Sequence, residues 1–145
     1  MPLFVADLST LLGEFNKLEA RAKDVALSLH ASGGKLESPP IRKIWDTNCF
    51  TLRDGDLAGL FPIAARFNHA CSPANNIDFR FDRDRGHLTL TVGADRIAAG
   101  EEMTISYGSG RSPLELYVWY GFRCRCGACG GLSDAELERF REAQW

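Results

Sequence analysis

The chain has 145 residues, of which 45% are hydrophobic and 25% are charged, and its formal net charge is −2. This length and composition suit one globular domain with its own hydrophobic core and exclude disordered and low-complexity classes. The 17 basic and 19 acidic residues are mixed along the chain, so the footprint of a basic nucleic-acid-binding protein is absent and we expect no direct nucleic-acid binding. The apolar stretches are too short to cross a bilayer, and the N-terminal segment MPLFVADLST lacks the features of a secretory signal. We therefore expect an intracellular protein, in the nucleus or the cytoplasm, with reduced thiols and no membrane partner.

Apolar residues recur at helical spacing in the N-terminal part of the chain. The pattern predicts one amphipathic helix over residues 7–30, capped by Asp7 or Ser9 and ended by the Gly33–Gly34 pair. We interpret its apolar stripe as core packing. The stripe consists of Leu8, Leu11, Leu12, Phe15, Leu18, Ala22, Val25 and Leu29.

A loop rich in Ser, Gly and Pro occupies residues 31–40. After it we expect a short helix over residues 41–45, a strand over residues 49–52 and a turn at Asp54–Gly55. The apolar period then changes to two, which predicts a hairpin with strands over residues 77–81 and 88–92 and a turn at residues 83–86.

Three further elements are expected towards the C-terminus. Met103, Ile105 and Tyr107 alternate with polar residues and predict a third strand. Ser112 and Pro113 open a helix that runs to residue 119, and Ser133 with Glu136 forms a capping box before a helix over residues 134–143. Helices at both ends and short strands between them favour an α+β fold rather than a doubly wound parallel sheet.

The segment Cys124-Arg-Cys126-Gly-Ala-Cys129 carries three closely spaced thiols. Zinc takes four tetrahedral ligands, so three thiolates on one turn predict three corners of a structural zinc site. Gly127 and Gly130 would allow the sharp backbone path, and the adjacent arginines, at positions 123 and 125, would offset the negative charge. The residues alone leave the fourth ligand open among Cys49, Cys71, His30, His69 and His87.

Three segments in order carry a resemblance to a known family: ARFNHACSP (65–73), AGEEMTISYG (99–108) and YGFRCRCGACG (120–130). Together they resemble the C-terminal half of a SET domain followed by a post-SET zinc motif. SET domains are the fold of many protein lysine methyltransferases. The likeness covers residues 41–130, includes the Asn48-x-Phe50 pair, and is nearest to the MYND-associated or small fungal subgroup, without a MYND finger.

The resemblance implies a cofactor, a metal and a set of site residues. It implies transfer of a methyl group from S-adenosylmethionine to a lysine of a protein substrate, histone or non-histone, with Tyr107 lining the lysine channel. It implies cofactor contacts from Asn48, Ala65, Arg66, Asn68, His69 and Phe122. It also makes Cys71 the fourth ligand of a structural Zn²⁺ with Cys124, Cys126 and Cys129, and leaves Cys49 as a small buried residue.

The resemblance also divides the chain. It implies a helical region like the family's insert over residues 1–40, the C-terminal half of the SET domain over 41–110, the zinc segment over 111–132 and a C-terminal helix over 133–145. The Gly-x-Gly loop that holds the methionine end of the cofactor in that family is not found before residue 41. Two hypotheses therefore stay open: a lysine methyltransferase, and a non-catalytic, zinc-stabilised SET remnant that acts as a protein-interaction module.

Overall fold

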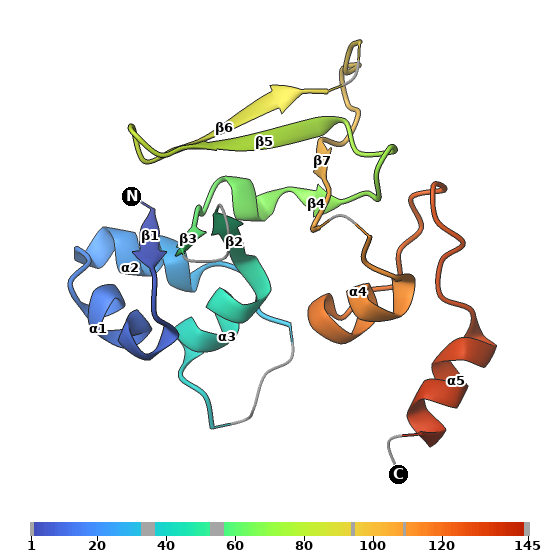
Figure 1. Cartoon of the computed structure of the whole chain (residues 1–145), viewed down its shortest axis with the longest axis horizontal. Helices are drawn as coiled ribbons and strands as arrows, with labels where there is room; N and C mark the ends of the chain where they lie inside the picture. The colour runs from blue at the N-terminus through green and yellow to red at the C-terminus, as the bar shows by residue number, and fades with distance from the viewer. Residues whose placement is uncertain (1, 33–36, 53–56, 94, 109, 144–145) are drawn as a thin grey trace. The chain divides into compact units, whose positions relative to one another are not determined.

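A computed structural model describes residues 2–32, 37–52, 57–93, 95–108 and 110–143 (Figure 1). These residues form five α-helices, two 3-10 helices and seven short strands, which confirms the predicted α+β class. The chain divides into two compact units, each of which is described by itself. The first unit is Met1–Phe67 with Arg80–Leu90, and the second is Asn68–Phe79 with Thr91–Trp145. The four-part division implied by the family resemblance stays a prediction.

The first unit contains a three-stranded antiparallel sheet in the order β1-β3-β2. Its strands are β1 (Leu3–Val5), β2 (Cys49–Leu52) and β3 (Leu57–Leu60). The register sets Leu60 opposite both Leu3 and Cys49. Leu60 is only 1% exposed and belongs to the main apolar cluster of this unit.

Helices α1 (Leu11–Asn16), α2 (Ala20–Leu27) and α3 (Pro40–Asn48) complete the first unit, with 3-10 helices η1 (Leu8–Thr10) and η2 (Ala64–Arg66). Helix α3 packs against α1 and α2. Its apolar face contributes three buried side chains to the core: Ile41, Ile44 and Trp45. The helix begins at a proline, where the missing N–H costs nothing. It extends three residues past the predicted end, and strand β2 is confirmed.

The single helix predicted over residues 7–30 is wrong. The chain leaves helical geometry between the two helices, because Glu19, the N-cap of α2, has an extended backbone. The break lets α1 pack on β1 and α3 while α2 packs on α3. Leu11, Phe15 and Leu29 are buried as predicted, whereas the stripe residues Leu8, Leu12 and Val25 are exposed. Strand β1 was not predicted, and the predicted Gly33–Gly34 stop and Asp54–Gly55 turn lie outside the described residues.

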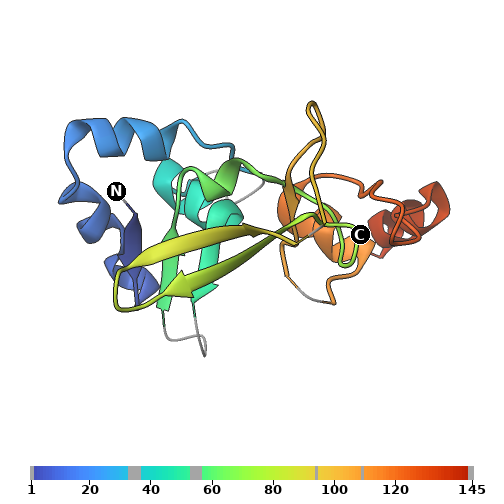
Figure 2. The same cartoon turned by 90° about the horizontal axis from the view of Figure 1, so that it is seen from above.

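The predicted hairpin is confirmed as β5 (Ile77–Asp82) and β6 (His87–Val92), seen from above in Figure 2. The part of it that belongs to the first unit packs on a second apolar cluster. There the ring of Phe81 lies 5.8 Å from that of Phe4 and 6.0 Å from that of Phe61, centroid to centroid. Aromatic contacts of this kind add to the stabilisation from buried area.

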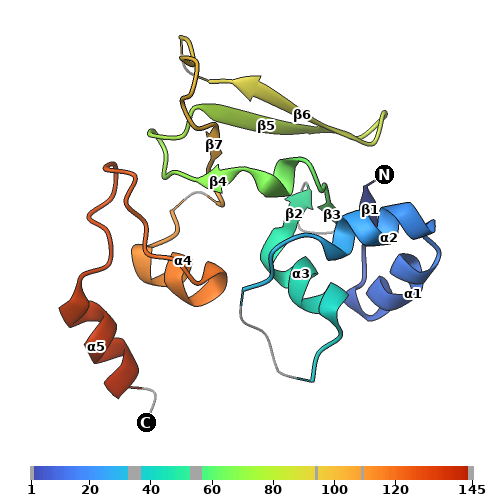
Figure 3. The same cartoon turned by 180° about the vertical axis from the view of Figure 1, so that it is seen from behind.

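The second unit is built on a short parallel pair, β4 (Asn68–His69) with β7 (Thr104–Ile105), which Figure 3 shows from behind. The alternating pattern predicted a longer third strand, but Met103 and Tyr107 lie outside β7. Helices α4 (Pro113–Tyr120) and α5 (Asp134–Glu142) follow. No described helix has the length and apolar character to cross a membrane.

Both C-terminal helices have well-defined ends. The capping box predicted at Ser133 and Glu136 is present, and Ser112 with Glu115 forms another. Helix α4 ends at Gly121, whose φ of 75° lies in the left-handed region that glycine adopts without strain. The chain therefore turns sharply between α4 and the segment that carries the cysteines.

Candidate functional site

Four cysteine sulfurs meet in the second unit. The Sγ atoms of Cys71, Cys124, Cys126 and Cys129 all lie within 4.8 Å of one another. Two of the separations, Cys71 to Cys124 and Cys126 to Cys129, are 3.8 Å. Sulfurs about 2.3 Å from a central zinc ion in a tetrahedron would be about 3.8 Å apart. The donor set and its spacing therefore fit a zinc ion.

The cluster also answers which of the five candidates lies beside the three clustered thiols. Cys71, and not Cys49, is the cysteine that joins them. Cys49 belongs to strand β2 of the first unit, where burial raises the pKa of its thiol to about 11. Four cysteines would fill all the corners of a tetrahedral site, which is the form of a structural rather than a catalytic centre.

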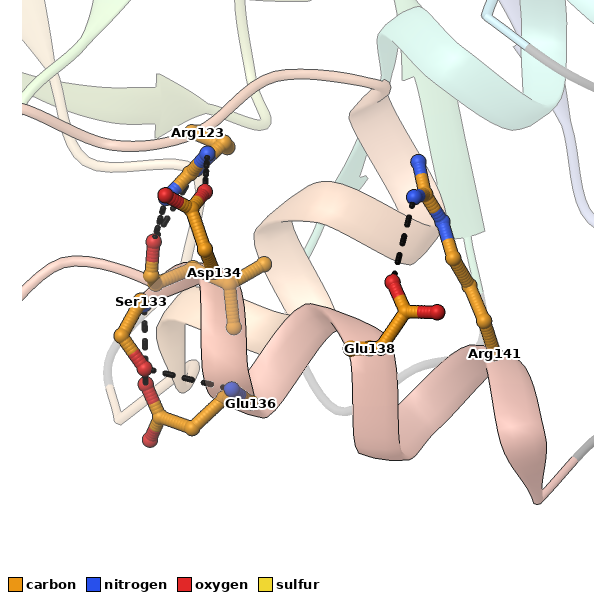
Figure 4. A network of polar contacts seen from close by, with 7 residues as sticks. Arg123, Ser133, Asp134, Glu136, Glu138 and Arg141 are labelled. Atoms are coloured by element: carbon orange, nitrogen blue, oxygen red, sulfur yellow. Dashed lines mark hydrogen bonds and ion pairs between the residues drawn. The ribbon is translucent and has the colours of Figure 1, made fainter.

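The loop that carries three of the cysteines is fastened at its base. The Arg123 guanidinium donates to the carbonyl of Leu132, and its Nη1 lies 2.6 Å from Oδ1 of Asp134 (Figure 4). Arg123 was expected to offset the charge of the sulfurs, but its ion pair is with Asp134. Gly127 has the expected left-handed φ of 80°, and the second such glycine is Gly131 rather than Gly130.

The thiols differ in how their ionised forms are stabilised. Burial opposes ionisation of Cys126, but hydrogen bonds from its neighbours, first among them the backbone N–H groups of Cys71 and Ala128, lower the pKa of its thiol to about 6. Burial raises the pKa of Cys71 and of Cys124. Metal binding replaces the protons of thiol ligands, so a bound cation would supply the charge that the protein does not.

The parallel pair β4–β7 brings His69 beside Tyr107. In its register Asn68 lies opposite Thr104, and His69 opposite Ile105. The backbone N–H of Tyr107 donates to Nδ1 of His69 at 3.0 Å. Nε2 of the same ring lies 3.2 Å from Sγ of Cys71. Burial lowers the pKa of His69 and so favours its neutral ring.

Three aromatic rings surround that of Tyr107. Its ring centroid lies 4.8 Å from Tyr120, 5.1 Å from His69 and 6.2 Å from Phe122. Burial, with smaller contributions from Tyr120 and Glu102, raises the pKa of Tyr107 to about 12. Its phenol is therefore protonated at neutral pH. Tyr120 was missed from the sequence, although its place two residues before Phe122 and four before the first clustered cysteine was a usable signal.

Asn68 and Asn76 form hydrogen bonds with the segment that leads into β7. Nδ2 of Asn68 donates to Oε1 of Glu102 at 2.6 Å, which leaves Oδ1 as the acceptor side of the amide. Asn76, only 8% exposed, accepts from the N–H of Thr104 and donates to the carbonyl of Glu102 and to Oε1 of Glu101. Asn76 was not predicted from the sequence.

The other predicted cofactor residues belong to the first unit. Nδ2 of Asn48 donates to the carbonyls of His30 and Ile44, which ties the end of α3 to the segment after α2. Ala65 and Arg66 lie in η2, and Arg66 donates to Oγ of Ser28 at 2.9 Å. The cofactor roles of these three residues stay predictions.

Comparison with known proteins agrees with this arrangement. A profile described as SET domain matches residues 10–108, more than half of the chain, so the chain belongs to the SET-domain family. The match confirms the family resemblance seen in the sequence motifs and begins well before residue 41, within the helical region.

Two methyltransferases are similar to part of the chain. The protein-lysine N-methyltransferase SMYD4 of Mus musculus is 35% identical over 78 residues, covering 49% of this chain and 9% of the mouse protein. The histone-lysine N-methyltransferase ATXR2 of Arabidopsis thaliana is 36% identical over 73 residues, covering 48% of this chain and 15% of the plant protein. The chain thus corresponds to a small part of the length of these relatives.

Proposed function

We propose that this chain carries the reaction centre of a SET-domain protein-lysine methyltransferase, which uses S-adenosylmethionine and a structural zinc ion. The observation that carries the proposal is the position of Tyr107, packed against His69 beside a four-cysteine cluster in a chain that belongs to the SET family. The names of the two relatives support the same reaction class. The substrate would be a lysine of a histone or of another protein.

Within the second unit, the residues fit part of the cofactor. Asn68 offers the carbonyl of an exposed amide, which suits an ammonium group, and Glu102 fixes that amide in place. Phe122 offers an aromatic ring suited to stacking on a purine. When bound, S-adenosylmethionine supplies a methyl group that its sulfonium has already activated. The task of the protein is therefore to position donor and acceptor.

Tyr107 would orient the reacting lysine through its hydroxyl. Since its pKa is about 12, the phenol stays protonated and acts through hydrogen bonding rather than as a base at neutral pH. The lysine must lose its proton before it attacks, and its ordinary pKa is about 10.4. An aromatic surround lowers that pKa because it solvates the ammonium form poorly. The zinc ion would take no part in the transfer and would hold Cys71, beside β4, to the loop after Phe122.

Calorimetric titration of the zinc-loaded chain with S-adenosylmethionine tests the proposal. We expect a Kd on the order of 1–10 μM, or about −7 to −8 kcal/mol, and loss of binding in Asn68→Ala. Asn75→Ala is the matched control, because this amide donates to the Ile77 carbonyl in the turn before β5. Transfer of labelled methyl from S-adenosylmethionine to histone proteins should stop in Tyr107→Phe.

The second function weighed from the sequence is a non-catalytic, zinc-stabilised interaction module. It predicts a folded chain with one zinc ion that does not bind S-adenosylmethionine. That result would overturn the methyltransferase proposal for this chain while leaving its family membership intact.

A further inference from the structure

The four cysteine sulfurs do not receive their hydrogen bonds in the same way. The sulfurs of Cys124 and Cys126 accept from backbone N–H groups within the cluster. At Cys71 the neighbouring nitrogen is a side-chain atom, Nε2 of His69, at 3.2 Å. One of the four proposed ligands is thus in contact with a residue that also reaches Tyr107.

The hydrogen bonds of His69 determine which ring nitrogen carries the proton. A backbone N–H only donates, so Nδ1 must accept from Tyr107 through its lone pair. A neutral ring that is unprotonated at Nδ1 is protonated at Nε2. The proton at Nε2 then lies on the side of Cys71 and can be donated to its thiolate.

We propose that His69 is a positioning residue that joins the metal centre to Tyr107. Its Nε2–H donates to the Cys71 thiolate, and its Nδ1 accepts from the Tyr107 N–H. The inference deepens the proposed function and rests on its zinc site. It gives the His69 side chain a task other than the cofactor contact implied by the family resemblance.

The residues on either side of this link are held firmly in place. Ala70, between His69 and Cys71, is 6% exposed, and its N–H donates to the carbonyl of Ile105. The ring of His69 packs against Tyr107 and Phe122, at centroid distances of 5.1 and 5.8 Å. Loss of the metal would therefore release the ring that holds the Tyr107 backbone.

Two substitutions separate the two hydrogen bonds. In His69→Asn the amide oxygen stands as far from Cβ as Nδ1 does, so it can accept from Tyr107 but cannot reach Cys71. In His69→Gln the amide nitrogen stands as far from Cβ as Nε2 does, so it can donate to Cys71 but does not replace Nδ1. Partners that hydrogen-bond to metal ligands change metal affinity by about 10- to 100-fold when lost.

Two readouts follow from this pair. Competition with a chelator should show zinc affinity about tenfold or more weaker in His69→Asn and nearly unchanged in His69→Gln. Hydrogen exchange should show the Tyr107 amide protected in the wild type and in His69→Asn, and unprotected in His69→Gln. Equal effects of both variants on both readouts would overturn the inference.

A measurement on the unmodified sequence keeps the test independent of variant stability. In the cadmium-113-loaded chain, the Nε2 proton of His69 should show a scalar coupling to the metal through the Cys71 sulfur. Nitrogen-15 shifts should report Nε2 as protonated and Nδ1 as unprotonated. A ring protonated at Nδ1, or a loaded protein without the coupling, would overturn this inference alone. A chain that binds no metal would instead overturn the zinc site of the proposed function, and the inference with it.

Discussion

Each of the two units is stabilised internally by a different kind of interaction. The first buries a cluster of ten apolar residues under its sheet and helices, and a second cluster adds packed phenylalanine rings. The second unit buries fewer large side chains. Its segments are joined by the cysteine cluster, by the buried side chain of Asn76 and by the ion pair of Arg123 with Asp134. A small apolar core is commonly compensated by metal or covalent cross-links. We infer that the first unit depends on packing, and the second on cross-linking.

Removal of the metal should give the largest difference in stability between the two units. Structural zinc contributes on the order of 10 kcal/mol to folding, so chelation or Cys124→Ser should unfold the second unit. Trp45, 4% exposed in the first unit, should keep its near-ultraviolet circular dichroism. Hydrogen exchange should show protection lost at Ala70 and Leu116 and retained at Leu60.

The control is Cys49→Ala, which alters the cysteine that lies outside the cluster and should retain one zinc ion per chain. If both units unfolded together on chelation, the proposed contrast between them would be wrong.

Two substitutions that each create a cavity, one in each unit, compare the two apolar cores. Leu60 in the first unit and Leu116 in the second are 1% and 0% exposed. Each Leu→Ala change should cost about 2–5 kcal/mol, measured by denaturant unfolding of the zinc-loaded chain. With chelator present, Leu116→Ala should have no further effect on the remaining transition, whereas Leu60→Ala should still lower it. Leu27→Ala, at a side chain 45% exposed, is the control for loss of helical leucine.

The polar link at Asn76 should be more sensitive to charge than to size. Asn76→Asp keeps the shape but turns a donor to Glu101 and the Glu102 carbonyl into an acceptor, so it should cost about 3 kcal/mol at neutral pH. The pKa of Glu101 is lowered by the Ala98 N–H and then by Asn76. The contribution of Glu101 in the wild type is therefore present above its ordinary pKa and is lost as the pH falls through the lowered value.

Asn76→Ala provides the comparison, measured by unfolding as a function of pH. The excess cost of Asp over Ala should shrink as the pH is lowered from about 7 to about 5, because burial and the neighbouring Glu101 raise the pKa of the new carboxyl group. An aspartate variant as stable as the alanine variant at neutral pH would contradict the assigned hydrogen bonds.

The smallest expected effect is the late ionisation of Tyr107. Its pKa is raised to about 12, mainly by burial, so the folded state favours the phenol. The resulting stabilisation is present below the ordinary tyrosine pKa of about 10 and is lost as the pH rises towards 12. The difference in absorbance at 295 nm between the wild type and Tyr107→Phe should titrate near pH 12, and a midpoint near 10 would show an exposed phenol.

The sequence predicted well those features that depend on neighbouring residues. The capping box of Ser133 and Glu136 and the hairpin of β5 and β6 are local patterns with a direct physical basis. Apolar periodicity found the buried residues Leu11, Phe15 and Leu29, but it also assigned exposed residues to the stripe and did not predict the break between α1 and α2. Apolar spacing indicates which residues are candidates for burial, whereas the continuity of a helix depends on the elements against which each turn packs.

Features that join distant residues were harder to predict. Strand β3 carries no alternation, and Gly59 within it lies close to the ring of Phe61. Strands β4 and β7 have two residues each, too few for any period to appear. Spacing alone predicted three of the clustered cysteines, and only the family resemblance singled out Cys71. Asn76 has no sequence signal apart from a polar residue next to an apolar strand.

The sulfurs of Cys71 and Cys124 meet although 53 positions separate them in the sequence. Contacts between such distant residues form late, because the intervening chain must first be brought together. During synthesis Cys71 leaves the ribosome well before its three partners, at about 5–20 residues per second. For a few seconds it lacks its three partner thiols, and the first unit can fold in that interval. Zinc supply would therefore set the time at which the second unit matures, after translation of the cysteine loop rather than during it.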